Sequence, residues 1–139
     1  MAKKKPMTWM GRSTRAKKSS IPDALKAQVD AKATELVEAV LKPKFIQPPP
    51  KKPRLNYIID VAAKWHASSL YFISTYASPG PTAISPTFEA RFARMEFVGS
   101  SKFNLSFMRH TGKWVVLFRS LSLDECLDAI ENNFWFQLG

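Results

Sequence analysis

The sequence predicts an α+β fold, in which an N-terminal amphipathic helix packs on a five-stranded antiparallel meander sheet and a short C-terminal helix follows. Three observations support this class. Apolar residues recur at helical spacing before residue 42, alternate with a period of two from Leu55 onward, and return to helical spacing after a capping motif at Ser122. A chain of 139 residues suits one domain with one modest core.

The first predicted helix is the segment IPDALKAQVDAKATELVEAVL, residues 21–41. Ser19 or Ser20 can cap it, and Pro22 suits the first helical turn. About 20 residues at 1.5 Å each span roughly 30 Å, which is long enough to cross a sheet. Pro43 is expected to end this helix. Its predicted apolar stripe consists of Leu25, Val29, Ala33, Leu36 and Val40.

Two segments without a regular apolar pattern flank this helix. Residues 1–19 mix Lys, Arg, Ser and Gly, and we expect them to form a flexible basic arm. Residues 43–54, PKFIQPPPKKPR, are expected to form an extended proline-rich linker, because proline fixes φ and lacks the backbone donor. The predicted division is therefore an arm over residues 1–19 and a single α+β domain over residues 20–139 that includes the linker.

Five stretches have the composition of β-strands. Each is rich in β-branched and aromatic residues and is bounded by turn residues. The stretches are LNYIIDVAAKW, LYFISTY, TFEARFARMEFV, KFNLSFMR and KWVVLFRS. The links between most of them are short, which predicts an antiparallel meander.

Two turns predict the register of the last three strands. A three-residue loop, His110–Gly112, requires Gly112 in the left-handed conformation. A second three-residue loop is expected at Gly99–Ser101. A slip of one residue would mix the apolar and polar faces, which a half-buried sheet resists. The two loops predict these opposed pairs: Phe107 with Val115, Leu105 with Leu117, Phe97 with Phe103, and Met95 with Leu105.

The opposite face of these strands is mixed. Because one long helix covers only part of a five-stranded sheet, we expect the apolar end of this face to be covered and the polar end to be open. The polar end carries Arg94, Glu96, Lys102, Asn104 and Ser106, and the apolar end carries Phe92, Met108, Trp114, Val116 and Phe118.

The C-terminal helix has a clear start signal. Ser122, with Glu125 three residues later, forms a capping box. An uncharged apolar tail follows the helix, and we expect it to dock on the body of the protein or on a second copy. The helix presents Leu123, Leu127 and Ile130 on one face, and the tail contains Phe134, Trp135, Phe136 and Leu138.

The formal net charge of +10 is unevenly distributed. Residues 1–19 carry seven Lys and Arg and no acid, and residues 42–54 carry five and no acid. Residues 20–41 have a net charge of −2, and residues 55–139 hold seven residues of each sign. The predicted sheet and C-terminal helix are therefore neutral as a whole, and the excess of positive charge lies in the arm and the linker.

No motif for catalysis, metal binding or cofactor binding occurs, and we favour a non-enzymatic protein without a metal or cofactor. His66, His110 and Cys126 fall on three different elements, so they do not form a metal-ligand set. Cys126 is expected to fill the core, and the histidines are expected to be solvated. A single cysteine forms no internal disulfide, and no apolar run of about 20 residues or secretory leader is evident. These features favour the cytoplasm and exclude a membrane-spanning protein.

The basic segments give the main functional hypothesis. Flexible cationic chain suits phosphate backbones, so we expect a binding protein for nucleic acid or another polyanion, including an acidic protein surface. Trp9 is the candidate for base stacking. The candidate polyanion-binding residues are Lys3, Lys4, Lys5, Arg12, Arg15, Lys17, Lys18, Lys51, Lys52 and Arg54.

Two alternatives remain open at this point. One is a small-molecule or enzymatic pocket between the long helix and the sheet, lined by Tyr57, Trp65, Arg94, Glu96 and Asn104. The other is an assembly subunit that contacts a second copy or another protein through Phe134, Trp135 and Phe136. Aromatic side chains on a sheet also stack bases in some RNA-binding modules, and the candidates here are Tyr57, Tyr71, Tyr76 and Trp65.

The stretches TFEARFARMEFVGSSKFNLSFMRHTGKW and LSLDECLDAI carry a resemblance to a known group. They resemble a small uncharacterised bacterial family, a domain of unknown function. The resemblance covers roughly residues 55–136 and leaves the basic arm outside it. It implies no activity, ligand or site.

Overall fold

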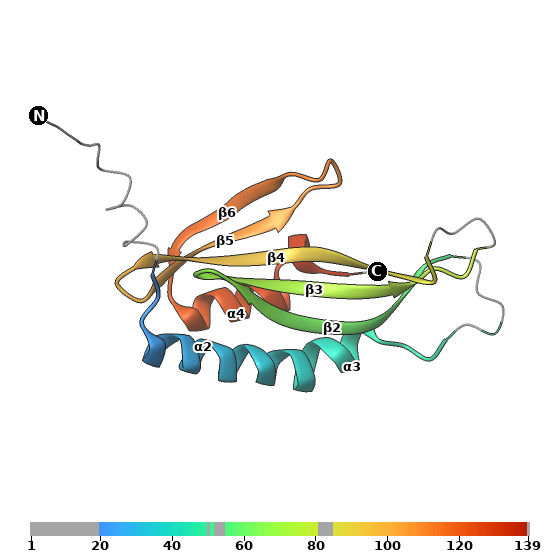
Figure 1. Ribbon diagram of the computed structural model, residues 1–139, viewed down its shortest axis with the longest axis horizontal. Helices are drawn as coiled ribbons and strands as arrows, with labels where there is room; N and C mark the ends of the chain where they lie inside the picture. The colour runs from blue at the N-terminus through green and yellow to red at the C-terminus, as the bar shows by residue number, and fades with distance from the viewer. Residues whose placement is uncertain (1–19, 50, 52–54, 81–84, 139) are drawn as a thin grey trace, which may run out of the picture.

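A computed structural model describes residues 20–49, 51, 55–80 and 85–138 (Figure 1). The α+β class is confirmed, and the sheet is the predicted antiparallel meander in the order β2-β3-β4-β5-β6. The helical elements are α2 (Asp23–Leu36), a π-helical turn η1 (Val37–Leu41), α3 (Lys42–Phe45), α4 (Leu123–Asn132) and a 3-10 turn η2 (Phe134–Phe136). The strands are β2 (Tyr57–His66), β3 (Ser69–Ala77), β4 (Thr87–Gly99), β5 (Lys102–Met108) and β6 (Trp114–Leu121).

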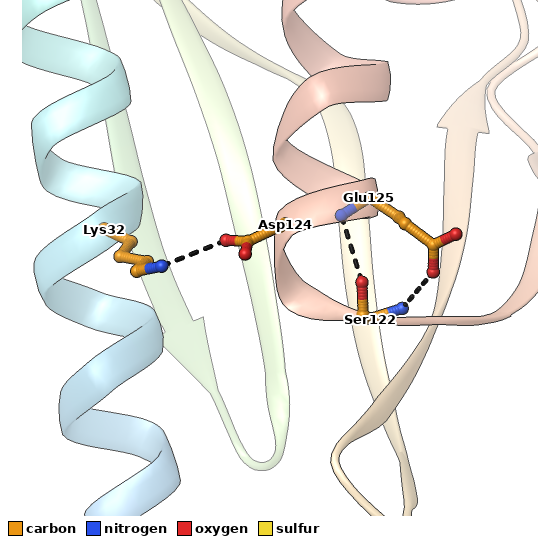
Figure 2. Close-up of polar contacts among 4 residues, drawn as sticks. All are labelled: Lys32, Ser122, Asp124 and Glu125. Atoms are coloured by element: carbon orange, nitrogen blue, oxygen red, sulfur yellow. Dashed lines mark hydrogen bonds and ion pairs between the residues drawn. The ribbon is translucent and has the colours of Figure 1, made fainter.

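The fold has two layers, with α2 and α4 on the same side of the sheet (Figure 1). Apolar side chains from both layers form one continuous core between them. Lys32 of α2 also forms an ion pair of 3.0 Å with Asp124 of α4, which joins the two helices at the surface (Figure 2). The largest fully buried side chains are Val29, Leu41, Leu70, Phe72, Met95, Phe103, Leu105, Ile130 and Phe136.

The start of the first helix differs from the prediction. Pro22 is the N-cap, without a side-chain cap, so the expected serine cap at position 19 or 20 is wrong. The chain is instead fixed just before the helix, where the backbone N–H of Ile21 donates to Ser68 Oγ in the β2–β3 turn at 3.1 Å. The predicted apolar stripe is confirmed, since its members are buried or packed against the core: Leu25, Val29, Ala33, Leu36 and Val40.

The end of this helix also differs, because helical structure continues through Pro43 to Phe45. In an α-helix the proline ring would clash with the carbonyl group four residues earlier. Here a π-helical turn comes first, in which the N–H of Lys42 bonds to the carbonyl of Val37. Since the regular hydrogen-bond ladder is already interrupted, Pro43 is accommodated. The predicted linker therefore loses residues 43–45 to the helix.

The predicted register is confirmed at most positions. Phe97 lies opposite Phe103, and the pairs Met95–Leu105 and Phe107–Val115 also form. Gly112 has the expected left-handed φ of 85°. Leu105, however, pairs with Phe118 and not with Leu117, because a bulge in β6 shifts the register. The turn after β4 has two residues and not three, since Gly99 pairs with Lys102.

A second bulge lies in β4 and redirects Phe92. Phe72 pairs with Ala93 whereas the next residue, Ile73, pairs with Arg91, so Phe92 is the extra residue. Its ring lies 6.3 Å from that of Phe72 and it belongs to the core. The expectation that Phe92 and Phe118 lie on the mixed face is therefore wrong, because both pack against the core.

The C-terminal elements follow the prediction. The hydroxyl of Ser122 accepts from the N–H of Glu125, whose carboxylate accepts from the N–H of Ser122, so the capping box is formed (Figure 2). The apolar tail docks on the body through Phe136, which is fully buried. Trp135 stacks on Phe107 with 4.7 Å between ring centroids, whereas Phe134 remains 79% exposed.

Candidate functional site

The candidate site is the sheet face opposite the helices, which we call the open face. Strand pairing sets one row of side chains across it. Lys64 of β2 lies opposite Tyr71 of β3, which lies opposite Arg94 of β4, and the row continues with Ser106 of β5 and Val116 of β6. On this face, within the described part of the chain, no helix covers the aromatic side chains, so the expected cover over its apolar end is absent.

The bulge at Phe92 brings two arginines to the open face. Arg91 and Arg94 are three residues apart, and a regular strand would direct them to opposite faces. With one extra residue between them, Arg91 lies opposite Ile73 while Arg94 lies opposite Tyr71. Because these two residues of β3 alternate regularly and share a face, their arginine partners share it too.

The two arginines cover two aromatic rings. The guanidinium of Arg91 lies 4.8 Å from the ring centroid of Tyr71, and that of Arg94 lies 5.0 Å from Trp114. The rings of Tyr71 and Trp114 meet edge to face with centroids 5.8 Å apart. We call these four residues the arginine–aromatic cluster. They take the place of a helix in shielding this part of the sheet from water.

The contact between the two rings of the cluster also indicates that the sheet is curved. Tyr71 and Trp114 belong to β3 and β6, which are separated by two strands. Neighbouring strands lie about 4.8 Å apart, so these positions would be roughly 14 Å apart in a flat sheet. Contact between the rings therefore requires a concave open face, and Figure 1 shows β5 and β6 running at an angle to β2–β4.

The sheet is positively charged although the body as a whole is neutral. Between Tyr57 and Leu121 the sequence holds seven Lys and Arg but three Asp and Glu, a net charge of +4. Helix α4 holds four acidic residues and no basic one. Among the described residues, neither Arg91 nor Arg94 forms an ion pair, whereas the nearby Lys64 lies 3.7 Å from Glu89. The cations of the cluster are thus available to an external anion.

Two buried polar atoms, one in the cluster and one on the neighbouring strand, have no partner among the described residues. Arg94 Nε and Ser106 Oγ are buried and form no hydrogen bond to any described residue. Ser106 is fully buried although it lies on the open face. A buried polar group without a partner costs about 1–3 kcal/mol, so such pairs are uncommon in folded proteins.

The structure separates the residues of the predicted helix–sheet pocket. Trp65 lies on the helix side, where its Nε1 donates to Asp30 of α2 at 3.2 Å. Asn104 is on the open face, where its Oδ1 accepts a hydrogen bond from the backbone N–H of Ser120. Tyr57 lies at the opposite end of β2 from Trp65. Glu96 is exposed opposite Asn104, and only Arg94 of the five belongs to the cluster.

Most predicted polyanion-binding residues lie outside the described residues. Lys51 is described and exposed. Of the sheet aromatics named from sequence, Tyr71 alone joins the cluster, while Tyr76 stacks on Phe88 at 5.1 Å and packs against the core. The other predicted polyanion-binding positions have no described geometry: Lys3, Lys4, Lys5, Trp9, Arg12, Arg15, Lys17, Lys18, Lys52 and Arg54.

Sequence reasoning missed Arg91, Trp114 and Ser106 as members of one site. The three-residue spacing of Arg91 and Arg94 concealed their common face, because the bulge cannot be seen in the alternation alone. Trp114 was expected to lie beneath a helix. An arginine on each side of a phenylalanine in the segment RFAR was the available signal, because a bulge at that phenylalanine brings both arginines to one face.

The remaining reactive side chains do not form a centre. Cys126 is fully buried in α4, and burial raises the pKa of its thiol to about 12. The expected packing role of this cysteine therefore agrees with its position. His66 is exposed at the end of β2, and His110 is exposed in the turn between β5 and β6. Within the described ranges, no group of three or more His, Cys, Asp or Glu side chains is arranged to hold a metal ion. None of the helices described is both long enough and apolar enough to cross a membrane.

Comparison with known proteins defines the class of this domain. A family model described as a domain of unknown function, DUF3024, matches residues 21–136. The chain belongs to this family. The resemblance noted from sequence is thus confirmed, and the match extends further towards the N-terminus than expected, over the long helix and the linker. No curated protein and no solved structure shows a significant match.

Proposed function

We propose that this protein is a non-enzymatic binding protein that contacts nucleic acid or another polyanion through its basic segments and the open face of its sheet. One observation carries the proposal. Arg91 and Arg94 are held over aromatic rings on a concave, positively charged surface and have no ion-pair partner among the described residues. An arginine held in this way keeps N–H groups that match phosphate oxygens in a bidentate geometry.

The basic segments add a second, sequence-independent contribution. Residues 1–19 and 42–54 together carry twelve Lys and Arg and no acid. Such residues bind phosphate backbones by releasing condensed counterions, so affinity falls steeply with salt. In this proposal they provide most of the affinity, and the open face provides a fixed point of contact.

The proposal is tested by fluorescence anisotropy with labelled single-stranded RNA, single-stranded DNA and duplex DNA at several salt concentrations. We expect binding whose log affinity falls linearly with log salt, with a slope of about −0.7 per neutralised phosphate for a single strand. A full-length variant with the seven basic residues of 1–19 changed to Gln should show a markedly shallower slope. If the protein binds none of these polymers at low salt, the proposal is wrong.

The contribution of the open face is separated by a charge-matched pair of variants. Arg91→Gln with Arg94→Gln removes two cations from the open face. Lys26→Gln with Lys32→Gln removes two cations from the helical layer, where Lys26 lies over the ring of Trp65 and Lys32 pairs with Asp124. We expect about tenfold weaker binding for the first variant and less than a twofold change for the second. Equal effects would show that net charge alone matters.

An exposed apolar group favours a second function, assembly with another copy of this chain. Phe134 is 79% exposed and Trp135 is 52% exposed, beside a surface hollow of about 460 Å³ lined by Phe107, Met108, Arg109, His110, Val115 and Trp135. Phe136 cannot take part in such a contact, because it is fully buried in the core of its own chain. Light scattering at increasing concentration should show a dimer that Phe134→Ser dissociates. A monomer at all concentrations would contradict this function.

A further inference from the structure

We propose that Arg94 and Ser106 form the binding point for one phosphodiester group of a single-stranded nucleic acid, beneath the ring of Trp114. This inference rests on the proposed function and specifies its ligand at the open face. It starts from two buried polar atoms that have no hydrogen-bond partner in the part of the chain that the structure describes, Arg94 Nε and Ser106 Oγ.

The strand register places the two residues that carry these atoms next to one another. Arg94 and Ser106 are directly opposed residues on β4 and β5. At such positions the two Cβ atoms lie about 4.5–5.5 Å apart, and both side chains leave the backbone on the same face. Both groups can donate a hydrogen bond, one from a guanidinium N–H and one from a hydroxyl. An anionic oxygen between them would accept both bonds and would remove the cost of burying each donor unpaired.

Trp114 is the side chain that controls access to this point. It is the first residue of β6, an edge strand that pairs with β5 alone among the described strands. Its ring contacts the guanidinium of Arg94 at 5.0 Å and the ring of Tyr71 at 5.8 Å. Because the indole is only partly buried, it can rotate away without disturbing the core. Ligand binding is therefore coupled to movement of Trp114.

Arg91 is the reason why we expect this site to bind single-stranded nucleic acid in preference to a duplex. Its guanidinium lies over Tyr71 at 4.8 Å, and the residue is exposed. An unpaired base can stack on the exposed face of a guanidinium group, as bases stack on aromatic rings in modules that bind single-stranded RNA. A base that is paired within a duplex does not offer its flat face. The arrangement thus combines a stacking plane at Arg91 with a phosphate contact at Arg94 and Ser106.

The test compares two serine-to-alanine variants of the full chain. Ser106→Ala removes one of the two donors. Ser69→Ala makes the same chemical change one row away on the open face, where Ser69 lies opposite Glu96. With a labelled single-stranded RNA of about ten nucleotides, we expect about fivefold weaker binding for Ser106→Ala, the value for one lost hydrogen bond, and no change for Ser69→Ala.

Two further measurements distinguish a ligand contact from a structural role. Ser106→Ala should leave the urea midpoint of the free protein unchanged or raise it, since the variant loses an unpaired buried hydroxyl. Arg94→Lys keeps the charge but loses the Nε donor, so it should weaken binding about tenfold while the salt slope stays the same. In a Trp9→Phe background the RNA should also change the tryptophan emission, and Trp114→Phe should abolish that change.

The outcomes separate this inference from the proposed function. If RNA binding depends on Arg91 and Arg94 but the two serine variants bind RNA equally well, the phosphate-binding role of Ser106 is wrong and the proposed function stands. If neither RNA nor DNA binds but inorganic phosphate changes the emission of Trp114, the nucleic acid is the wrong source and both proposals fall. If duplex DNA binds as tightly as the single strand of the same length, the stacking role of Arg91 is wrong.

Discussion

The two faces of the sheet shield their aromatic side chains in different ways. On the helix-covered face, Phe72 and Phe103 are fully buried beneath apolar side chains from α2 and α4. On the open face, Tyr71 and Trp114 are covered by two arginines and by one another. Both faces shield their rings, and on the open face the shielding groups are two arginines without an ion-pair partner among the described residues, which can also bind a ligand.

This difference separates stability from binding. Burial of apolar surface contributes about 25 cal/mol per Å², so a buried phenylalanine contributes several kcal/mol together with its packing. A cation–π contact at an exposed site contributes about 0.5–1 kcal/mol. We therefore expect the helix-covered face to hold the fold together and the open face to tolerate substitution. The following predictions test that division, beginning with the largest effect.

The largest expected effect is that of Phe103→Ala. Phe103 is fully buried and its ring meets Phe97 edge to face at 5.8 Å, so its removal leaves a cavity between the sheet and the helices. We expect a loss of about 3–5 kcal/mol in the free energy of unfolding, measured by urea denaturation. A loss below about 1 kcal/mol would show that the helix-covered face is not the main source of stability.

The second prediction concerns the pH dependence that Cys126 confers. Burial raises the pKa of this thiol from 9.0 to about 12 in the folded protein. Above pH 9 the unfolded chain loses the thiol proton while the folded protein keeps it, so the contribution to stability is complete below pH 9 and is lost as pH rises towards 12. The maximum slope is about 1.4 kcal/mol per pH unit.

The measurement compares the parent protein with Cys126→Ala across this pH range. The difference in unfolding free energy between the two proteins should be constant below pH 9 and should change in favour of the variant above it. Thiol-reactive dye should label Cys126 only at the rate at which the protein opens. Rapid labelling of the native protein would contradict the burial of this side chain.

Local signals in the sequence predicted much of the helix-covered face. The alternation of apolar residues gave the opposed pairs Phe97–Phe103 and Met95–Leu105, and the Ser122 capping box predicted the start of α4. These features depend on neighbours in the chain or on a single turn. The passage of the helix through Pro43 was not predictable in this way, because it depends on a π turn that leaves no clear pattern in the residues.

The open face was less predictable because it depends on bulges and curvature. One extra residue at Phe92 decides that Arg91 and Arg94 share a face, and nothing in the alternation of the strand specifies it. Contact between Tyr71 and Trp114 then requires the whole sheet to curve. Both are properties of strand pairing over long distances, which one strand considered alone does not reveal.

The third prediction addresses the capping box that begins α4. The backbone hydrogen bond from Ser122 lowers the pKa of Glu125, and the serine hydroxyl caps the helix in return. Ser122→Ala should reduce the free energy of unfolding by about 1 kcal/mol in urea denaturation at neutral pH. Because the pKa of Glu125 is lowered in the folded protein, its stabilising contribution should fade as acid protonates it. Ser120→Ala, outside the capping box, is the control and should have a smaller effect.

The smallest expected effect is that of Arg91→Gln on stability. Arg91 is exposed, and its described contact is with the ring of Tyr71, so its loss should cost about 0.5 kcal/mol. Arg91→Lys, which keeps a cation over the ring, should cost less still. Urea denaturation of both variants beside Phe103→Ala compares the two faces directly. If Arg91→Gln destabilised the protein as much as Phe103→Ala, the open face would be a second structural core and its substitution could not be used to test binding.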